Sequence, residues 1–117
     1  MKANLRLSFA AREDILDVLR YTESRFGSAA RIRYQSLLFA AFTSLAREPV
    51  RIGSKAREEL AAGLRSLHLS HCRNETGAAR VARPRHVVFY RLGNDLAVEI
   101  VRILHEAMDL ERHLSRD

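Results

Sequence analysis

Hydrophobic and polar residues alternate at the start of the chain, and the spacing then becomes helical. Residues 5–9 alternate between apolar and polar side chains, which is typical of a short half-buried strand. From Ser8 the apolar positions are three and four residues apart until Gly27, a residue that commonly ends helices. Ser8 can cap this helix, and Glu13 and Asp14 stand near its start, where the helix dipole favours acids. The pattern predicts a strand followed by an amphipathic helix.

A second, longer helix is predicted between Ser28, as its cap, and Pro49, which cannot continue it. Its apolar residues spread over more than one side, since Ile32 and Phe39 lie outside the main stripe. We expect the sheet to cover one side of this helix and another element or a partner to cover the other. A well-buried hairpin helix is the alternative.

Alternation returns in the second half of the chain. Residues 50–63 lack a strong period and predict a connector with a helical turn around 56–62. Residues 64–71 alternate as a strand does. Two β-branched and aromatic runs, 86–92 and 96–104, are joined by Gly-Asn-Asp and predict a hairpin. A long loop is expected before them and a short helix within residues 105–115.

The predicted order is β-α-α-β-β-β-α, which indicates an α+β fold. In such a fold a small, antiparallel-rich sheet carries the N-terminal helical hairpin on one face. The length of 117 residues suits a single domain spanning residues 1–117.

The charge distribution points to an anionic partner. The net charge is +6, and residues 65–91 hold six arginines against one acid, Glu75. Acids outnumber arginines from Asn94 onward. Nucleic acid or an acidic protein segment is therefore the expected partner of the basic region.

Several classes of function find no support in the sequence. There is no apolar run of the roughly 20 residues that a membrane helix needs, and the start of the chain has no signal-peptide pattern, so a cytoplasmic protein without membrane contact is expected. One cysteine, Cys72, excludes an internal disulfide and a multi-cysteine metal site. The five histidines match no compact zinc pattern, and neither a phosphate-binding loop nor a nucleophile elbow occurs. No cofactor or metal is expected.

The carboxyl end carries a family resemblance. Residues 98–109 read V-E-I-V-R-I-L-H-E-A-M-D and precede Arg112-His113-Leu114. This resembles the ending of ParE-type toxins of the ParE/RelE superfamily, in which the last strand runs into an R-I-L-H-x-x-M-D stretch. Pro49, Gly53, residues 63–65 and residues 86–91 stand in the family's order, so the resemblance covers nearly the whole chain. The stretch from Cys72 to Arg85 departs from it, being longer and richer in arginine.

The resemblance implies a toxin of a type II toxin-antitoxin system with the compact fold shared with RelE. It implies growth inhibition, of the kind that stabilises plasmids, through binding of DNA gyrase, without catalysis. An antitoxin encoded alongside, ParD-like or another small antitoxin, would neutralise the toxin in a hetero-oligomer. Any contact with DNA would then be indirect, through the antitoxin or the gyrase complex.

Two other functions stay open. A RelE-like, ribosome-dependent mRNA endoribonuclease would need a proton acceptor, a proton donor and positive charge at the phosphate. Candidates across adjacent strands are Arg65, Arg85, His86, Arg91 and His105, but Glu106 and Asp109 would repel a phosphate. A detoxified relative that acts as a binding module is the third hypothesis, suggested by the acidic tail.

Two sets of binding residues follow from these hypotheses. The target-binding set comprises the carboxyl segment and supporting arginines: Leu104, His105, Met108, Asp109, Arg112, His113, Arg65, Arg85 and Arg91. The antitoxin-binding set comprises apolar residues of the two helices: Leu16, Leu19, Ile32, Leu38 and Phe39. An ordinary core or a homodimer surface would give the same apolar pattern on the helices.

Overall fold

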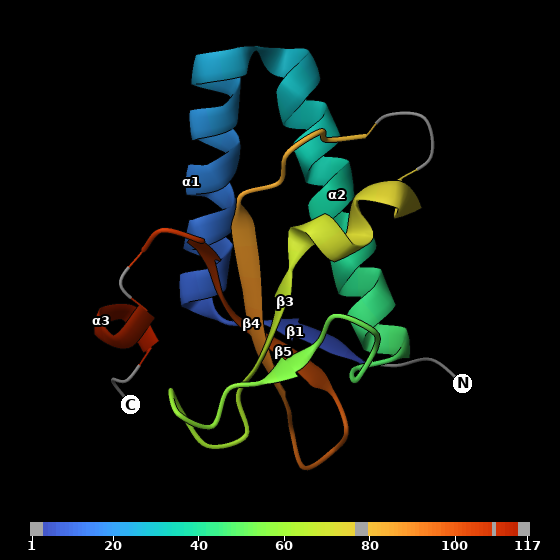
Figure 1. Cartoon of the computed structure of the whole chain (residues 1–117), viewed down its shortest axis with the longest axis vertical. Helices are drawn as coiled ribbons and strands as arrows, with labels where there is room; N and C mark the ends of the chain where they lie inside the picture. The colour runs from blue at the N-terminus through green and yellow to red at the C-terminus, as the bar shows by residue number, and fades with distance from the viewer. Residues whose placement is uncertain (1–3, 77–79, 109, 115–117) are drawn as a thin grey trace.

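The computed structural model describes residues 4–76, 80–108 and 110–114. Two long helices form an antiparallel hairpin, and the strands cross beside it (Figure 1). The elements, in chain order, are β1 (Leu5–Leu7), α1 (Phe9–Phe26), α2 (Ser28–Arg47), β2 (Lys55–Ala56), β3 (Arg65–His68), the 3-10 helix η1 (Leu69–Glu75), β4 (His86–Leu92), β5 (Val98–His105) and α3 (Leu110–Leu114). The α+β fold with its N-terminal helical hairpin is confirmed.

The sheet is mixed, with strand order β1-β5-β4-β3-β2. β4 pairs antiparallel with β5 and β3, and β2 with β3, whereas β1 runs parallel to β5. The parallel pair is possible because the entire helical hairpin and the other strands lie between β1 and β5 in the chain. β1 is short, so β5 continues past its end.

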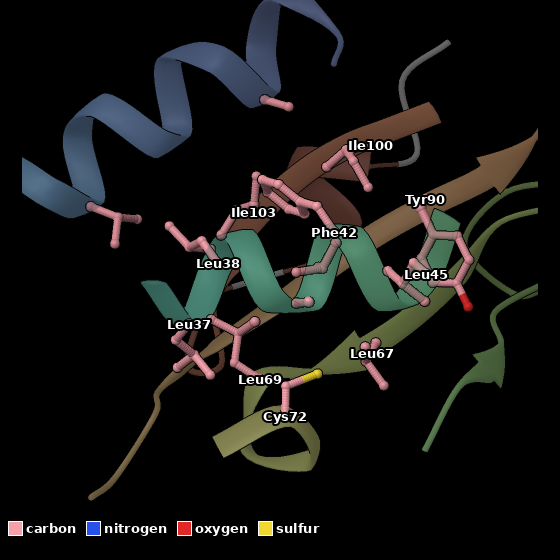
Figure 2. Close-up of a cluster of buried hydrophobic side chains, with 14 of the residues drawn as sticks. Leu37, Leu38, Phe42, Leu45, Leu67, Leu69, Cys72, Tyr90, Ile100 and Ile103 are labelled. Atoms are coloured by element: carbon pink, nitrogen blue, oxygen red, sulfur yellow. The ribbon is translucent and has the colours of Figure 1, made fainter. Parts of the chain in front are cut away.

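Hydrophobic side chains cover both faces of the sheet. The larger cluster lies between the sheet and the helical hairpin, and Figure 2 shows α2 at its centre. Its labelled side chains come from α2, β3, η1, β4 and β5: Leu37, Leu38, Phe42, Leu45, Leu67, Leu69, Cys72, Tyr90, Ile100 and Ile103. A smaller cluster on the other face joins Phe89 and Leu104 of the sheet to Leu64 and to Leu114 of α3. The second cluster anchors the C-terminal helix to the sheet.

The junction between the two helices differs from the sequence prediction at one residue. The Ser8 hydroxyl accepts a hydrogen bond from Ala11 N, so the predicted cap of α1 is confirmed. Ser28, however, is the first residue of α2 and its side chain caps nothing, so that prediction is wrong. Gly27 is the whole connection: with φ at 95° it ends α1 and occupies the N-cap position of α2. No residue is left between the helices to act as a separate cap.

The boundaries of two strands differ from the prediction, because apolar residues continue to alternate beyond the last residue that pairs with a neighbouring strand. The strand expected over 64–71 ends at His68, because the chain coils into η1 there. The last strand begins at Val98 rather than Leu96, which has a φ of 66° in the hairpin turn. β2 was not predicted, since both of its residues are exposed. A turn is present in the connector, where Leu60 N and Ala61 N donate to Arg57 O.

The short C-terminal helix expected within residues 105–115 is present as α3, which begins at Leu110, after the end of β5 at His105 and the turn that follows it. In the part of the chain that the structure describes, no helix has both the length and the apolar character needed to cross a membrane.

Candidate functional site

The predicted target-binding residues fall at two separate ends of the sheet. His105, the last residue of β5, is paired with His86, and Arg85 stands immediately before β4. Arg91 and Arg65 lie near the opposite ends of these paired strands. Five residues along a strand span roughly 17 Å. The structure therefore brings Arg85 together with His105 but leaves Arg65 and Arg91 at a distance.

His86 is neutral and lies within hydrogen-bond distance of Tyr34 of α2. Arg85 N donates to the Tyr34 hydroxyl at 3.1 Å, and this hydroxyl lies 2.7 Å from His86 Nδ1. The hydroxyl oxygen accepts from Arg85 N, so the arrangement suits donation of the phenol proton to Nδ1 of a neutral imidazole that has its own proton on Nε2. Burial, reinforced by His105, lowers the pKa of His86 to about 4, and burial raises the pKa of Tyr34 to about 12. Both groups are uncharged at neutral pH.

This pairing predicts a loss of stability in mild acid. The unfolded chain takes up a proton at His86 near pH 6.5, whereas the folded chain resists protonation down to about pH 4. Stability is therefore complete above pH 6.5 and falls as the pH decreases toward 4, by about 2 kcal/mol between pH 7 and pH 5. Urea unfolding at stepped pH values measures the decrease. In His86→Gln, which cannot titrate, most of the slope should vanish; an unchanged slope would exclude His86 as its source.

His105 and the residues after it form a tight turn. Ala107 N donates to His105 Nδ1 at 3.0 Å, and Met108 N donates to the His105 carbonyl at 3.0 Å. The neutral His105 ring therefore has its proton on Nε2. Its ring centre lies 5.3 Å from that of His86, edge to face. Met108 is 44% exposed at the end of this turn.

Glu106 neutralises the positive charge at this end of the sheet. Its carboxylate accepts a hydrogen bond from His68 Nε2 at 2.7 Å and lies 3.3 Å from Arg85 Nη1. These contacts lower the pKa of Glu106, the hydrogen bond from His68 most of all. Sequence reasoning identified Glu106 as a repulsive acid but missed both partners, because His68 and Arg85 lie in distant segments of the chain.

The remaining target-binding candidates differ in their accessibility. Leu104 is buried in one cluster with Leu114, so it helps to hold α3 on the sheet and is not accessible to a target protein. His113 is exposed, and its carbonyl lies 3.4 Å from Arg102 Nη1. Asp109 and the side chain of Arg112 lie outside the described residues.

A groove runs along the outer face of α2. It consists of two adjoining hollows of about 630 and 670 Å³, which share Phe39, Ala40 and Glu75. Phe39 is 73% exposed, Ile32 is 64% exposed, and Ile52 is also exposed at the far end. The hollow that Ile32 lines is mainly apolar, whereas the hollow that Ile52 lines also has many polar and charged residues. We call the two hollows together the α2 groove.

The predicted antitoxin-binding residues are divided between this groove and the core. Ile32 and Phe39 line the groove and are exposed. Leu19 and Leu38 also line it, but they are almost completely buried in the main core. Leu16 is partly exposed on α1 and does not line either hollow.

Arg51 fixes one wall of the α2 groove and was missed by the sequence analysis. Its guanidinium donates to Ser44 Oγ at 2.7 Å, to Glu75 at 2.8 Å and to the His71 carbonyl at 3.0 Å. It therefore joins α2 to η1. A single arginine in a connector gives no sequence pattern from which this role could be inferred.

No metal-binding group was found in the described ranges, where no three histidine, cysteine, aspartate or glutamate side chains are suitably arranged.

Comparisons with known proteins identify the family. Residues 5–110 match the family model described as ParE toxin of the type II toxin-antitoxin system, parDE. The chain is 35% identical to Toxin ParE1 of Caulobacter vibrioides over 109 residues, 93% of this chain and 95% of that protein. It is 29% identical to Toxin ParE1 of Mycobacterium tuberculosis over 114 residues, 97% of this chain and all of that protein.

Solved structures share the fold. A chain from the chromosomal ParDE toxin-antitoxin system of P. aeruginosa matches with a TM-score of 0.67 and 13% identity, over 89% of this chain and 96% of that one. A chain of the Mycobacterium tuberculosis RelBE2 toxin-antitoxin complex matches with a TM-score of 0.52 and 25% identity, over 90% and 99%. Since the family model covers most of the sequence, the chain belongs to the family of ParE toxins of type II toxin-antitoxin systems.

Proposed function

We propose that this ParE-family toxin inhibits DNA gyrase by binding to it, without cleaving RNA, and that an antitoxin encoded alongside neutralises it. The observation that carries the choice of binding over catalysis is the position of Glu106 between His68 and Arg85. Gyrase as the target follows from the family resemblance. The cytoplasm, where gyrase acts, is the compartment proposed for this toxin.

The strand-end cluster is poorly suited to cutting RNA. Cleavage beside a 2′-hydroxyl needs a free proton acceptor and a cation at the phosphate. His86 is half-buried, and its Nδ1 is occupied by Tyr34. Arg85 is compensated by the Glu106 carboxylate, which would repel an approaching phosphate. These contacts favour a binding surface over a nuclease site.

The α2 groove supports the proposal of an antitoxin partner. Exposed apolar residues along one helix suit a partner segment that folds on binding. Both solved structures above come from toxin-antitoxin systems. We propose that the antitoxin, ParD-like or another small antitoxin, contacts Phe39 and Ile32 directly in a hetero-oligomer, with Leu16 beside them and Leu19 and Leu38 supporting the groove from the core.

The turn after β5 is the proposed target-binding surface. It offers Nε2 of His105 and the exposed side chain of Met108, with Arg85 beside them. We include Asp109, Arg112 and the exposed His113 in the same proposed surface. Arg65 and Arg91 lie near the opposite ends of the strands, so they cannot contact the same part of the target as His105 and Met108. A large target would have to reach them through a second part of its surface.

Substitution of His105, Met108 and Arg112 by alanine together should raise the toxin concentration that inhibits gyrase at least tenfold, because three side chains of the proposed target surface are removed. The measurement is supercoiling by purified gyrase, with detection of trapped cleaved DNA, with and without the product of the neighbouring small gene. Circular dichroism checks that the triple variant is folded. A folded triple variant that inhibits gyrase as well as the wild-type chain would refute this assignment of the target surface.

A RelE-like ribosomal endoribonuclease is the second candidate, favoured by the likeness to the RelBE2 chain. It predicts unaffected gyrase and new transcript ends after induction in growing cells. Sequencing of transcript ends therefore separates the two functions. No effect in either assay would instead indicate a detoxified relative.

A further inference from the structure

We infer that Glu106 is a positioning residue, which fixes the turn at residues 105–108 in the orientation that presents His105 and Met108 to the target. The inference rests on the proposed function of that turn. The family pattern leaves this position open, and the sequence assigned it only a repulsive charge. In the structure its carboxylate links the turn to His68 and Arg85, in addition to the edge-to-face contact between the His105 and His86 rings.

The backbone alone holds the turn through few contacts. Glu106 N donates to the Arg85 carbonyl at 2.9 Å, which extends the pairing of β4 and β5 by one residue. Beyond it, Ala107 N and Met108 N both bond back to His105, within the turn itself. These local bonds shape the turn but do not fix it against the neighbouring strands.

The Glu106 side chain supplies the missing tether. From the end of β5 it extends past Arg85, at the start of β4, to His68, at the end of β3. The His68 ring is itself oriented, because Ser70 N donates to its Nδ1 at 3.1 Å. This bond leaves the proton on Nε2, the atom that faces Glu106. One carboxylate therefore ties the turn to two strands.

This tether should affect position more than stability. The side chains of Glu106 and Arg85 are 37% and 51% exposed, and exposed ion pairs contribute little to folding. Loss of the carboxylate would free the turn while the two hydrophobic clusters remain intact. Catalytic and binding surfaces commonly depend on such supporting contacts to hold their geometry.

The test compares Glu106→Ala, Glu106→Gln, His68→Ala and the Glu106→Ala/His68→Ala double variant in the gyrase assay. Glu106→Ala should raise the inhibitory concentration about tenfold. Glu106→Gln should have a smaller effect, since its amide oxygen still accepts from His68. If Glu106 acts through His68, the double variant is no worse than Glu106→Ala alone. Additive effects of the two alanines would overturn the inference.

Asp95→Asn is the matched control. Asp95 forms an exposed ion pair with Arg6 at 2.9 Å, at the opposite end of β5, and an asparagine oxygen can still accept from Ala97 N. The control removes the same charge from a similar pair without touching the turn. It should leave inhibition unchanged, and an effect equal to that of Glu106→Gln would overturn the inference.

Amide hydrogen exchange tests the same tether without any target. Exchange at Ala107 and Met108 should become at least fivefold faster in Glu106→Ala, whereas amides in β4 and the melting temperature stay close to those of the wild-type chain. Unchanged exchange in the turn, or equal acceleration throughout the chain, would refute a positioning role. If wild-type chain fails to inhibit gyrase, the proposed function falls, and the exchange result still decides whether Glu106 holds the turn.

Discussion

Replacing Asp14 with alanine is expected to lower the free energy of unfolding by roughly 3 kcal/mol or more. Asp14 lies on α1 and its side chain is 12% exposed. Both of its oxygens accept from the guanidinium of Arg102, at 2.8 and 3.0 Å, and one also accepts from Ile103 N at 2.9 Å. The alanine variant would leave a mostly buried cation and a backbone N–H without their partner.

The position of Asp14 explains why the effect should be large. β1 pairs with β5 only as far as Ile100, so the rest of β5 has no neighbouring strand on that side. The start of α1 replaces it: the Ser8 hydroxyl donates to the Val101 carbonyl, and Asp14 accepts from Ile103 N. The hydrogen bond with Asp14 also raises the pKa of Arg102. Loss of Asp14 therefore removes the polar link between α1 and the second half of β5, and leaves only the Ser8 contact and the hydrophobic core to hold them together.

Urea unfolding at pH 7 measures this effect, with Asp17→Ala as the control. Asp17 lies on the same helix, is 73% exposed and is 3.7 Å from Arg20, so its loss should cost less than about 0.5 kcal/mol. Asp14→Asn should fall between the two, because an amide oxygen can still accept from Ile103 N. Equal stability of the Asp14 and Asp17 alanine variants would show that the link between α1 and β5 carries no stability.

The sequence predicted the helices and hairpins that depend on residues close together in the chain. The hairpin of β4 and β5 and the extent of α1 followed from the period of apolar residues and from the Ser8 cap. The parallel pairing of β1 with β5 could not follow, because it joins segments more than 90 residues apart. The first residues of η1 were mistaken for strand because Leu67, Leu69 and His71 alternate with other residues, and a short alternation does not distinguish the start of a 3-10 helix from an extended strand.

In the candidate site, too, the sequence did not predict contacts between residues far apart in the chain. Sequence placed Asp14 near the helix dipole and gave Glu106 only a repulsive charge, but both act on partners in distant segments. Ile32 and Phe39 lie outside the main stripe of α2 and are exposed, whereas the sequence had left open that they belong to an ordinary core. Leu19 and Leu38 have the same apolar character and are buried, so composition alone could not separate core from surface.

Phe39→Glu is expected to weaken binding of the antitoxin at least 100-fold. Phe39 stands where the two hollows of the α2 groove meet, and aromatic side chains at the centre of an interface often contribute 2 kcal/mol or more. A glutamate there would also place a charge in an apolar contact. Because Phe39 is exposed in the free chain, folding should change little. Calorimetric titration with the purified antitoxin measures the dissociation constant.

Phe26→Glu is the control, since Phe26 is 67% exposed on the same helical hairpin but does not line the α2 groove. It should change antitoxin affinity less than fivefold. A cell-based readout follows from the same contact: with antitoxin present, the Phe39 variant should inhibit growth while the Phe26 variant stays neutralised. Equal weakening by both substitutions would place the antitoxin across the whole hairpin rather than in the groove. Unchanged affinity of Phe39→Glu would exclude the groove, and the exposed apolar face of α2 would then require a different partner.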